Sequence, residues 1–315
     1  MKNLIFVVFT LISSLILAQC PREDLVALMD IAKEVKEKLM TEFWEEWKDV
    51  PMITLLIDGQ SEFLINHNPT SDSSFHRACG HLSRAAGFND NLLATFPLIE
   101  GKPTIVMGTP EKTHKSAVGW TATLLHEHFH QLQFSKPNYF TVQKALNLDK
   151  GDQTGMWMLN YDFPYEEAAV NEQFKRLANT LLSLDQSNDK EVLELYKNDK
   201  VKLKNMLSAD DYKYLNLQLW QEGYARYVEL ELLRKWIDRF SEITQNTLTD
   251  TELIDELQAN EALIINHLSS SSPKELRRIY FYALGAAEAR LIARTNPAWK
   301  AQYFDQLFTT DHLMY

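Results

Sequence analysis

The stretch Thr123-Leu124-Leu125-His126-Glu127-His128-Phe129-His130-Gln131-Leu132-Gln133 decides how the rest of the chain is interpreted. It contains the pattern His126-Glu127-x-x-His130. Residues four apart on a helix lie about 40° apart around its axis, so both imidazoles can reach one cation. Glu127 is about 100° round from His126. There, a carboxylate borders the metal without binding it, and it can take a proton from a water that the metal activates.

The flanking residues favour a buried helix, because Leu124, Leu125, Phe129 and Leu132 supply apolar faces on either side of the histidines. The alternative is a helix with a histidine-rich turn exposed to solvent. A catalytic zinc usually takes three protein ligands and keeps a fourth position for water. The choice between the two interpretations therefore depends on a third ligand.

The best downstream candidate for that ligand is Glu222, in the segment Leu219-Trp220-Gln221-Glu222-Gly223-Tyr224-Ala225-Arg226-Tyr227-Val228-Glu229. This segment resembles the W-x-N-E-G-x-A-x-Y-x-E segment of gluzincin metallopeptidases, such as the thermolysin-like aminopeptidases. The resemblance implies that His126, His130 and Glu222 hold Zn²⁺ and that Glu127 is the catalytic base. Gln221 stands where the family usually has Asn.

The spacing departs from that family, because the gap between His130 and Glu222 is much longer than in the aminopeptidases. The intervening segment resembles an inserted helical region, and it contains two rival ligands, Glu166 and Glu167. Glu222 is favoured because Gly223 leaves room for close helix packing at a buried site. The rivals can instead be carboxylates at a helix N-terminus, or partners of a zinc-ligating histidine.

Hydrolysis of an amide builds negative charge on the carbonyl oxygen, and gluzincins commonly offset it with a Tyr or His donor. By that resemblance we expect Tyr282 to be the oxyanion donor. It lies in a late helical segment with small residues at Ala283 and Gly285. The alternative is a tyrosine packed in a helical core. Arg226 is expected to form a surface ion pair, with a substrate carboxylate or the Glu222 region as other partners.

The chain has 315 residues, enough for a large core in one or two domains. Its formal net charge is −11, and no basic run stands out. Nucleic acid is therefore not an expected partner. An acidic surface favours solubility and says little about substrate.

Residues 1–18 are predicted to be a signal peptide, with Lys2 at its start, a mostly apolar run and the small residue Ala18 at the cleavage point. The apolar run is short for a membrane span, so the mature chain is expected to have none. The protein is then exported, either secreted or periplasmic, in a bacterium. The alternative is a lipoprotein signal over residues 1–19, because Leu17-Ala18-Gln19-Cys20 resembles a lipobox with Cys20 lipidated.

Two cysteines, Cys20 and Cys79, remain after such cleavage. They can form one disulfide in an oxidising compartment, or Cys20 can be lipidated and Cys79 free. The sequence leaves both outcomes open.

The fold class expected is α+β, with a single zincin-like domain from residue 19. Its mixed α/β part covers about residues 19–135 and its helical part about residues 136–315. A helix over 22–47 precedes a hairpin formed by 52–57 and 62–66, and a third strand covers 104–108. A small sheet before an H-E-x-x-H helix is the layout of zincin catalytic domains. By that resemblance, residues 104–109 are expected to form the edge that binds substrate backbone as an added strand.

The second half of the chain is predicted to be mostly helical. The segment 137–164 is rich in loops, and its aromatic and Met side chains are candidates for substrate subsites or for the core: Met156, Trp157, Tyr161 and Phe163. Helices are expected over 166–184, 190–206, 208–239, 249–268 and 272–293.

The expectation for function is a secreted zinc-dependent peptidase that hydrolyses a peptide or protein substrate, as the resemblance implies. Two alternatives stay open. One is a zinc hydrolase of a non-peptide amide or ester. The other is a non-catalytic binding protein that keeps the fold.

Overall fold

The structure is a computed structural model that describes residues 20–67, 70–152, 155–243 and 247–315. The segment predicted to be a signal peptide, residues 1–18, or 1–19 in the lipoprotein alternative, lies outside the described residues. Within the described ranges, no helix combines the length and the hydrophobicity needed to cross a membrane.

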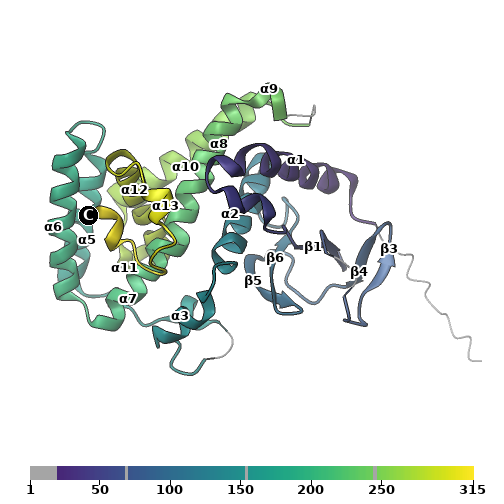
Figure 1. Ribbon diagram of the computed structural model, residues 1–315, viewed down its shortest axis with the longest axis horizontal. Helices are drawn as coiled ribbons and strands as arrows, with labels where there is room; N and C mark the ends of the chain where they lie inside the picture. Colours follow the sequence, from purple (N-terminus) through teal and green to yellow (C-terminus); the bar gives the residue numbers. More distant parts are fainter. Residues whose placement is uncertain (1–19, 68–69, 153–154, 244–246) are drawn as a thin grey trace, which may run out of the picture.

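The fold is α+β, as predicted, with a six-stranded mixed sheet and a large helical part (Figure 1). The sheet and helix α1 (Glu23–Leu39) lie at one end of the molecule, and helices α5 (Ala168–Leu182) and α6 (Asp189–Met206) lie at the other. Helices α2 (Ala117–Phe134) and α8 (Tyr224–Asp238) lie between them, and they pack against each other.

The strand order in the sheet is β3-β4-β2-β1-β6-β5. The predicted hairpin is confirmed: β1 and β2 are antiparallel, with Asp58 opposite Ser61. Strands β1 and β6 are parallel, and the other neighbours are antiparallel. The strand bounds are β1 Thr54–Asp58, β2 Ser61–Ile65, β3 His76–Ala78, β4 His81–Ala85, β5 Leu93–Ile99 and β6 Lys102–Gly108.

The expectation that residues 104–109 form the sheet edge is wrong, because β6 lies between β1 and β5. The edge strand beyond β6 is β5, which was not predicted. Pro97 inside β5 argues against a strand in the middle of a sheet, but proline is tolerated on an edge strand. The β3–β4 hairpin was missed too, because its strands are short. Its turn residues, Cys79 and Gly80, have φ values of 51° and 85°, as a two-residue hairpin turn requires.

The helix predicted over 22–47 is shorter than expected. Helix α1 ends at Leu39, and two 3₁₀ turns follow, η1 (Met40–Glu42) and η2 (Glu45–Asp49). Trp44 and Trp47 are buried, and both rings pack against Phe129 of α2. The chain therefore leaves regular α-helical geometry after α1, in the segment where Trp44 and Trp47 pack against α2.

The predicted helices of the second half are present, with two differences. The helix expected over 272–293 is interrupted at Arg277, where φ is 51°, so that α11 and α12 are separate. The helix expected over 208–239 contains a π-helical segment, η3. The bounds not yet given are α3 Tyr139–Ala145, α4 Trp157–Asn160, α7 Ala209–Gln218, η3 Leu219–Gly223, α9 Phe240–Ile243, α10 Asp250–Ser270, α11 Pro273–Leu276, α12 Ile279–Thr295, α13 Trp299–Gln302 and η4 Asp311–Met314.

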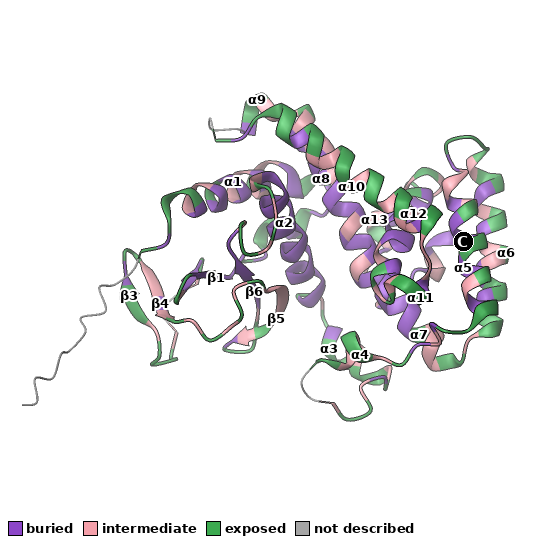
Figure 2. Cartoon of the chain, turned by 180° about the vertical axis from the view of Figure 1, so that it is seen from behind, coloured by how far each residue is buried: buried purple, intermediate pink, exposed green. Residues whose placement is uncertain are grey.

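One hydrophobic core joins the two parts of the chain. It contains Leu25 of α1, Phe129 of α2, Trp220 of η3 and Leu284 of α12, all buried. The buried residues drawn in Figure 2 accordingly continue from α2 into the helical part. The core thus fixes α2 against the helices that follow it.

Candidate metal centre

Helix α2 is buried along almost its whole length, from Val118 to Phe134 (Figure 2). Its N-cap is Ser116, whose hydroxyl accepts a hydrogen bond from the backbone N–H of Gly119. His126 and His130 are each only 5% exposed, and their ring centres are 4.9 Å apart. The alternative of a solvent-exposed histidine turn is therefore wrong.

Glu222 lies beside both imidazoles. Its Oε2 atom is 3.4 Å from Nε2 of His130 and 4.0 Å from Nε2 of His126. One ligand atom from each of these three residues lies within 4.8 Å of the others. In the part of the chain that the structure describes, this is the cluster of His, Cys, Asp or Glu side chains that could hold a metal.

Glu222 is presented from η3, where one turn of the long helix is widened to π geometry. Such π turns insert one residue into a helix and often occur at functional sites. The neighbouring Gly223 packs on Gly285 of α12 without side chains between the two backbones. The close helix approach expected at Gly223 is therefore present.

The rival carboxylates lie elsewhere. Glu166 is exposed and pairs with Arg277 at 2.7 Å and with Lys274 at 3.2 Å. Glu167 is exposed at the residue that precedes α5. Both positions correspond to the alternative of carboxylates at a helix N-terminus, and neither belongs to the His126–His130 cluster.

The ring of His130 is held in one orientation by Gln133. The side-chain Nε2 of Gln133 donates to the backbone oxygens of Trp220 (3.3 Å) and Gln221 (3.1 Å). Its Oε1 is therefore an acceptor, and it accepts a hydrogen bond from His130 Nδ1 over 2.7 Å. Nε2 of His130 faces Glu222. Burial alone would lower the pKa of His130, but the Glu222 carboxylate raises it to about 9, so Nε2 carries a proton that a bound cation would replace.

Glu229 does the same for His126. Its Oε2 atom is 2.9 Å from Nδ1 of His126, and its Oε1 accepts from Arg226 at 2.7 Å. Burial alone would raise the pKa of Glu229, but Arg226 and His126 lower it to about 2. The ionised carboxylate only accepts hydrogen bonds, so His126 Nδ1 is the donor and Nε2 keeps its lone pair.

Metal-ligating histidines characteristically donate their second N–H to a carboxylate or another acceptor, and both histidines here do so. Glu229 and Gln133 were not predicted in this role. Glu229 lies two helical turns after Glu222, a spacing that could have placed it on the same helix face. Arg226 is not the expected surface ion pair, because it lies half-buried between Glu229 and Asn260.

The charge on Glu222 also suits a cation site. Burial alone would raise the pKa of Glu222, but the adjacent His130 and His126 lower it. The carboxylate is therefore ionised. Two imidazole nitrogens and one ionised carboxylate oxygen form the donor set of a catalytic zinc site, so these residues fit Zn²⁺.

Glu127 is 7% exposed, and it lies close enough to His130 for its charge to help raise the pKa of that ring. Its carboxylate oxygen Oε2 is buried and has no hydrogen-bond partner among the described residues. Its backbone oxygen accepts a hydrogen bond from Thr95 of β5 over 3.0 Å. This hydrogen bond joins edge strand β5 to α2 at Glu127, the candidate base.

Tyr282 of α12 also comes close to the cluster. Its hydroxyl accepts a hydrogen bond from Arg278 over 2.7 Å. Burial and the nearby Glu222 carboxylate raise the pKa of Tyr282 well above its usual value. The hydroxyl therefore keeps its proton and can donate it in a hydrogen bond.

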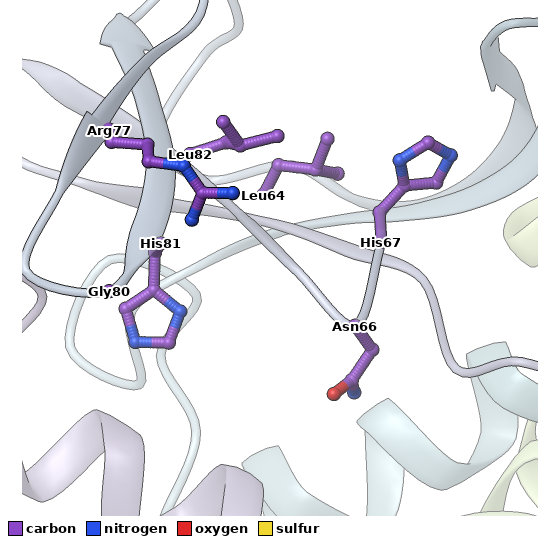
Figure 3. A pocket seen from close by; sticks show the side chains of 7 residues that line it. All are labelled: Leu64, Asn66, His67, Arg77, Gly80, His81 and Leu82. Atoms are coloured by element: carbon purple, nitrogen blue, oxygen red, sulfur yellow. The ribbon is translucent and has the colours of Figure 1, made fainter. Parts of the chain in front are cut away.

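The other histidines are separate from this cluster. His128 packs against Trp47, donates to Gln131, and has its pKa lowered to about 3 by burial, so it is a neutral core residue. His67 and His81 line a hollow of about 300 Å³ beside β2 and β4. Figure 3 shows that these two rings stand apart and do not point toward one another.

The side chains predicted to form either substrate subsites or core have different surroundings. Phe163 is buried and packs edge-on against Phe281, so it belongs to the core. Tyr161 stacks on Tyr214, and Met156 is exposed. The core alternative therefore holds for Phe163.

Comparison with known protein families, with curated proteins and with solved structures finds no match to this chain.

Proposed function

We propose that the protein is a zinc-dependent peptidase of the gluzincin type, with a zincin-like catalytic domain. The observation that supports this most is the orientation of the two imidazoles. Gln133 and Glu229 occupy the Nδ1 atoms of His130 and His126, so both Nε2 atoms face the ionised Glu222. An imidazole pair in a purely structural role has no need of this arrangement.

The chemistry follows from the groups around that cluster. When bound by these three residues, zinc lowers the pKa of a water to about 7 and polarises a carbonyl. Glu127 takes a proton from the attacking water with its unpartnered carboxylate and then gives a proton to the leaving amine. Tyr282 donates a hydrogen bond to the carbonyl oxygen as negative charge builds there.

Edge strand β5 is the place for the substrate backbone. Its outer edge has no neighbouring strand in the described sheet, and Thr95 attaches it to the backbone of Glu127. A peptide that pairs with this edge as an added strand lies next to α2. We therefore propose that β5, and not residues 104–109, binds the substrate backbone.

The proposed compartment is the periplasm or the medium. The structure joins Cys20 and Cys79 in a disulfide, a bond that persists in oxidising compartments. Lipidation would use the same sulfur of Cys20. The disulfide therefore favours a cleaved signal peptide over the lipoprotein alternative.

The test is hydrolysis of a peptide library by protein exported to an oxidising compartment and loaded with zinc. We expect cleavage that a chelator abolishes and added zinc restores, with Glu127→Gln as an inactive control. Turnover of small acyl esters without any peptide cleavage would instead support a zinc hydrolase of non-peptide substrates. Binding of peptides without turnover would support the non-catalytic alternative.

A further inference from the structure

A small pocket lies beside the candidate metal centre, between helices α8, α10 and α12. It has a volume of about 140 Å³. Tyr282 forms part of its lining, and the field of Glu222 acts on the hydroxyl of that residue. Arg226 is also part of the lining, and it contacts Glu229, the partner of His126. The pocket is therefore one side chain away from the zinc-ligand candidates.

The guanidinium of Arg226 is only partly used. Its Nη1 atom donates to Glu229 over 2.7 Å and to Asn260 over 3.3 Å. The atoms Nε and Nη2 make no hydrogen bond in the part of the chain that the structure describes. Because Glu229 and Asn260 fix its orientation, the guanidinium offers a preset pair of donors, which matches the two oxygens of a carboxylate.

The other residues that line the pocket suit a carboxylate group that carries only a small substituent. Among the described residues that line the pocket there is no Asp or Glu. His267 faces it from α10, and burial and Arg226 lower the pKa of His267, so the neutral ring can donate one hydrogen bond. Leu263, Ile264 and Ala283 provide apolar walls.

The size of the pocket limits the ligand. A cavity of about 150 Å³ holds one benzene molecule, so the pocket has room for about six non-hydrogen atoms. A C-terminal alanine contributes about five beyond its nitrogen, namely Cα, Cβ and the three atoms of the carboxylate. A side chain such as phenylalanine does not fit without displacement of the walls.

The position of the pocket sets which bond is cleaved. Tyr282, the proposed oxyanion donor, lines the pocket, and its pKa is raised by burial and by the Glu222 carboxylate nearby. One extended residue spans about 3.3–3.6 Å. A carboxylate on Arg226 therefore leaves the preceding peptide carbonyl, one residue away, beside Tyr282.

We infer that this pocket binds the C-terminal residue of the substrate through Arg226, and that the enzyme is a carboxypeptidase which releases a small residue such as alanine or glycine. The inference rests on the peptidase activity proposed above. In the reaction, the water oxygen bonds to the carbonyl carbon and the C–N bond breaks. The released amino acid takes its proton through Glu127, and the shortened peptide keeps a new carboxylate.

The test compares matched peptides with the zinc-loaded full-length mature protein. One ends in a free-acid alanine, one in alanine amide, one in free-acid phenylalanine, and one in aspartate amide. We expect kcat/KM for free-acid alanine to exceed that for alanine amide by roughly tenfold to a hundredfold, as a charge-assisted hydrogen-bond pair implies. Free-acid phenylalanine should be the poorer acid substrate.

Two outcomes overturn the inference while leaving the peptidase proposal intact. Equal cleavage of the acid and the amide would show that no terminal carboxylate is recognised. Preference for aspartate amide over alanine amide would show that Arg226 binds a side-chain carboxylate instead. If the zinc-loaded protein cleaves none of these peptides and nothing in a peptide library, the peptidase proposal itself fails.

Variants separate substrate binding from support of the metal centre. Arg226→Gln should lower kcat/KM for the free acid more than for the amide, so that the ratio of the two falls toward one in samples of equal zinc content. An equal loss for both substrates would mean that Arg226 only orients Glu229, and it would overturn the inference. Leu263→Ala should widen the pocket and raise cleavage of free-acid phenylalanine. Ile265→Ala, on the same helix but outside this pocket, is the matched control; an equal effect of both would count against the pocket.

Discussion

The backbones of Gly223 and Gly285 touch each other: a Cβ atom added to Gly285 would lie 2.7 Å from the Cα atom of Gly223 and 3.0 Å from the carbonyl oxygen of Leu219. This contact holds α12 against the π turn. It brings Tyr282, three residues earlier on α12, near Glu222, which directly precedes Gly223. Because neither glycine has a side chain, Tyr282, the proposed oxyanion donor, can lie close to Glu222, the proposed ligand.

Gly285→Ala is therefore expected to lower the free energy of unfolding by about 1–3 kcal/mol, the usual cost of an overpacked core. The better helix propensity of alanine, about 1 kcal/mol, offsets only part of that cost. Urea denaturation measures the change. Gly87→Ala is the control, because its added Cβ meets only Glu62 at an ordinary 3.8 Å. Equal stability of both variants would contradict the proposed close contact.

Glu229→Ala is expected to weaken zinc binding by roughly tenfold to a hundredfold, because His126 loses the acceptor that fixes its tautomer. Competition with a coloured zinc chelator measures the dissociation constant. Glu231→Ala is the matched control on the same helix, since Glu231 pairs with Arg234 and not with the cluster. Unchanged zinc affinity in Glu229→Ala would remove Glu229 from the metal centre.

Glu127→Gln should keep zinc and lose turnover by roughly 10²–10⁴-fold, the usual contribution of a general base. The amide has nearly the shape of the carboxylate but cannot take a proton. Peptide hydrolysis and zinc content are measured on the same samples. Glu166→Gln, an exposed carboxylate that pairs with Arg277, should keep full activity. Normal turnover in Glu127→Gln would refute its role as base.

Asp311 is expected to stabilise the fold only at pH values above its unfolded pKa. Its carboxylate lies 3.1 Å from Lys200 Nζ and accepts from Tyr212 over 2.8 Å. Burial alone would raise the pKa of Asp311, but Lys200 outweighs burial and the net shift is downward. A lowered folded pKa adds stability above the unfolded pKa of about 3.9, and this is lost as pH falls through the folded pKa.

Asp311→Asn should therefore cost roughly 2 kcal/mol of unfolding free energy at pH 7, and less as the pH falls below about 4. Urea denaturation at pH 7 and pH 3.5 measures the difference. Asp305→Asn, an exposed position, should change little at either pH. A cost for Asp311→Asn that is the same at both pH values would show that its charge is not responsible.

The α+β class, the β1–β2 hairpin and the main helices were predictable because each has a strong local pattern. Ser208 and Thr249 begin α7 and α10 with side-chain caps, as their residue types favour. Strand β5 was not predictable, since Pro97 is compatible with a strand only at an edge, and the edge is set by tertiary pairing. Likewise, no local sequence pattern predicts the π turn at Glu222.

The candidate site likewise contains residues that were predictable from a local pattern and residues that were not. The spacing of His126 and His130 is a property of one helix, so the sequence alone places them together. Glu222 is distant in sequence, and its position depends on how η3 packs against α2 and α12. Gln133 and Glu229 were missed because their role is visible only when both helices are in place.

The most direct test of the central claim is the zinc content of the purified mature protein by mass spectrometry, beside Glu222→Ala and the double variant Glu166→Ala/Glu167→Ala. The account predicts about one zinc per chain in the parent and in the double variant, and its loss in Glu222→Ala. Zinc retained in Glu222→Ala but lost in the double variant would contradict the ligand set. A parent protein that binds no zinc when zinc is supplied would contradict the metal centre altogether.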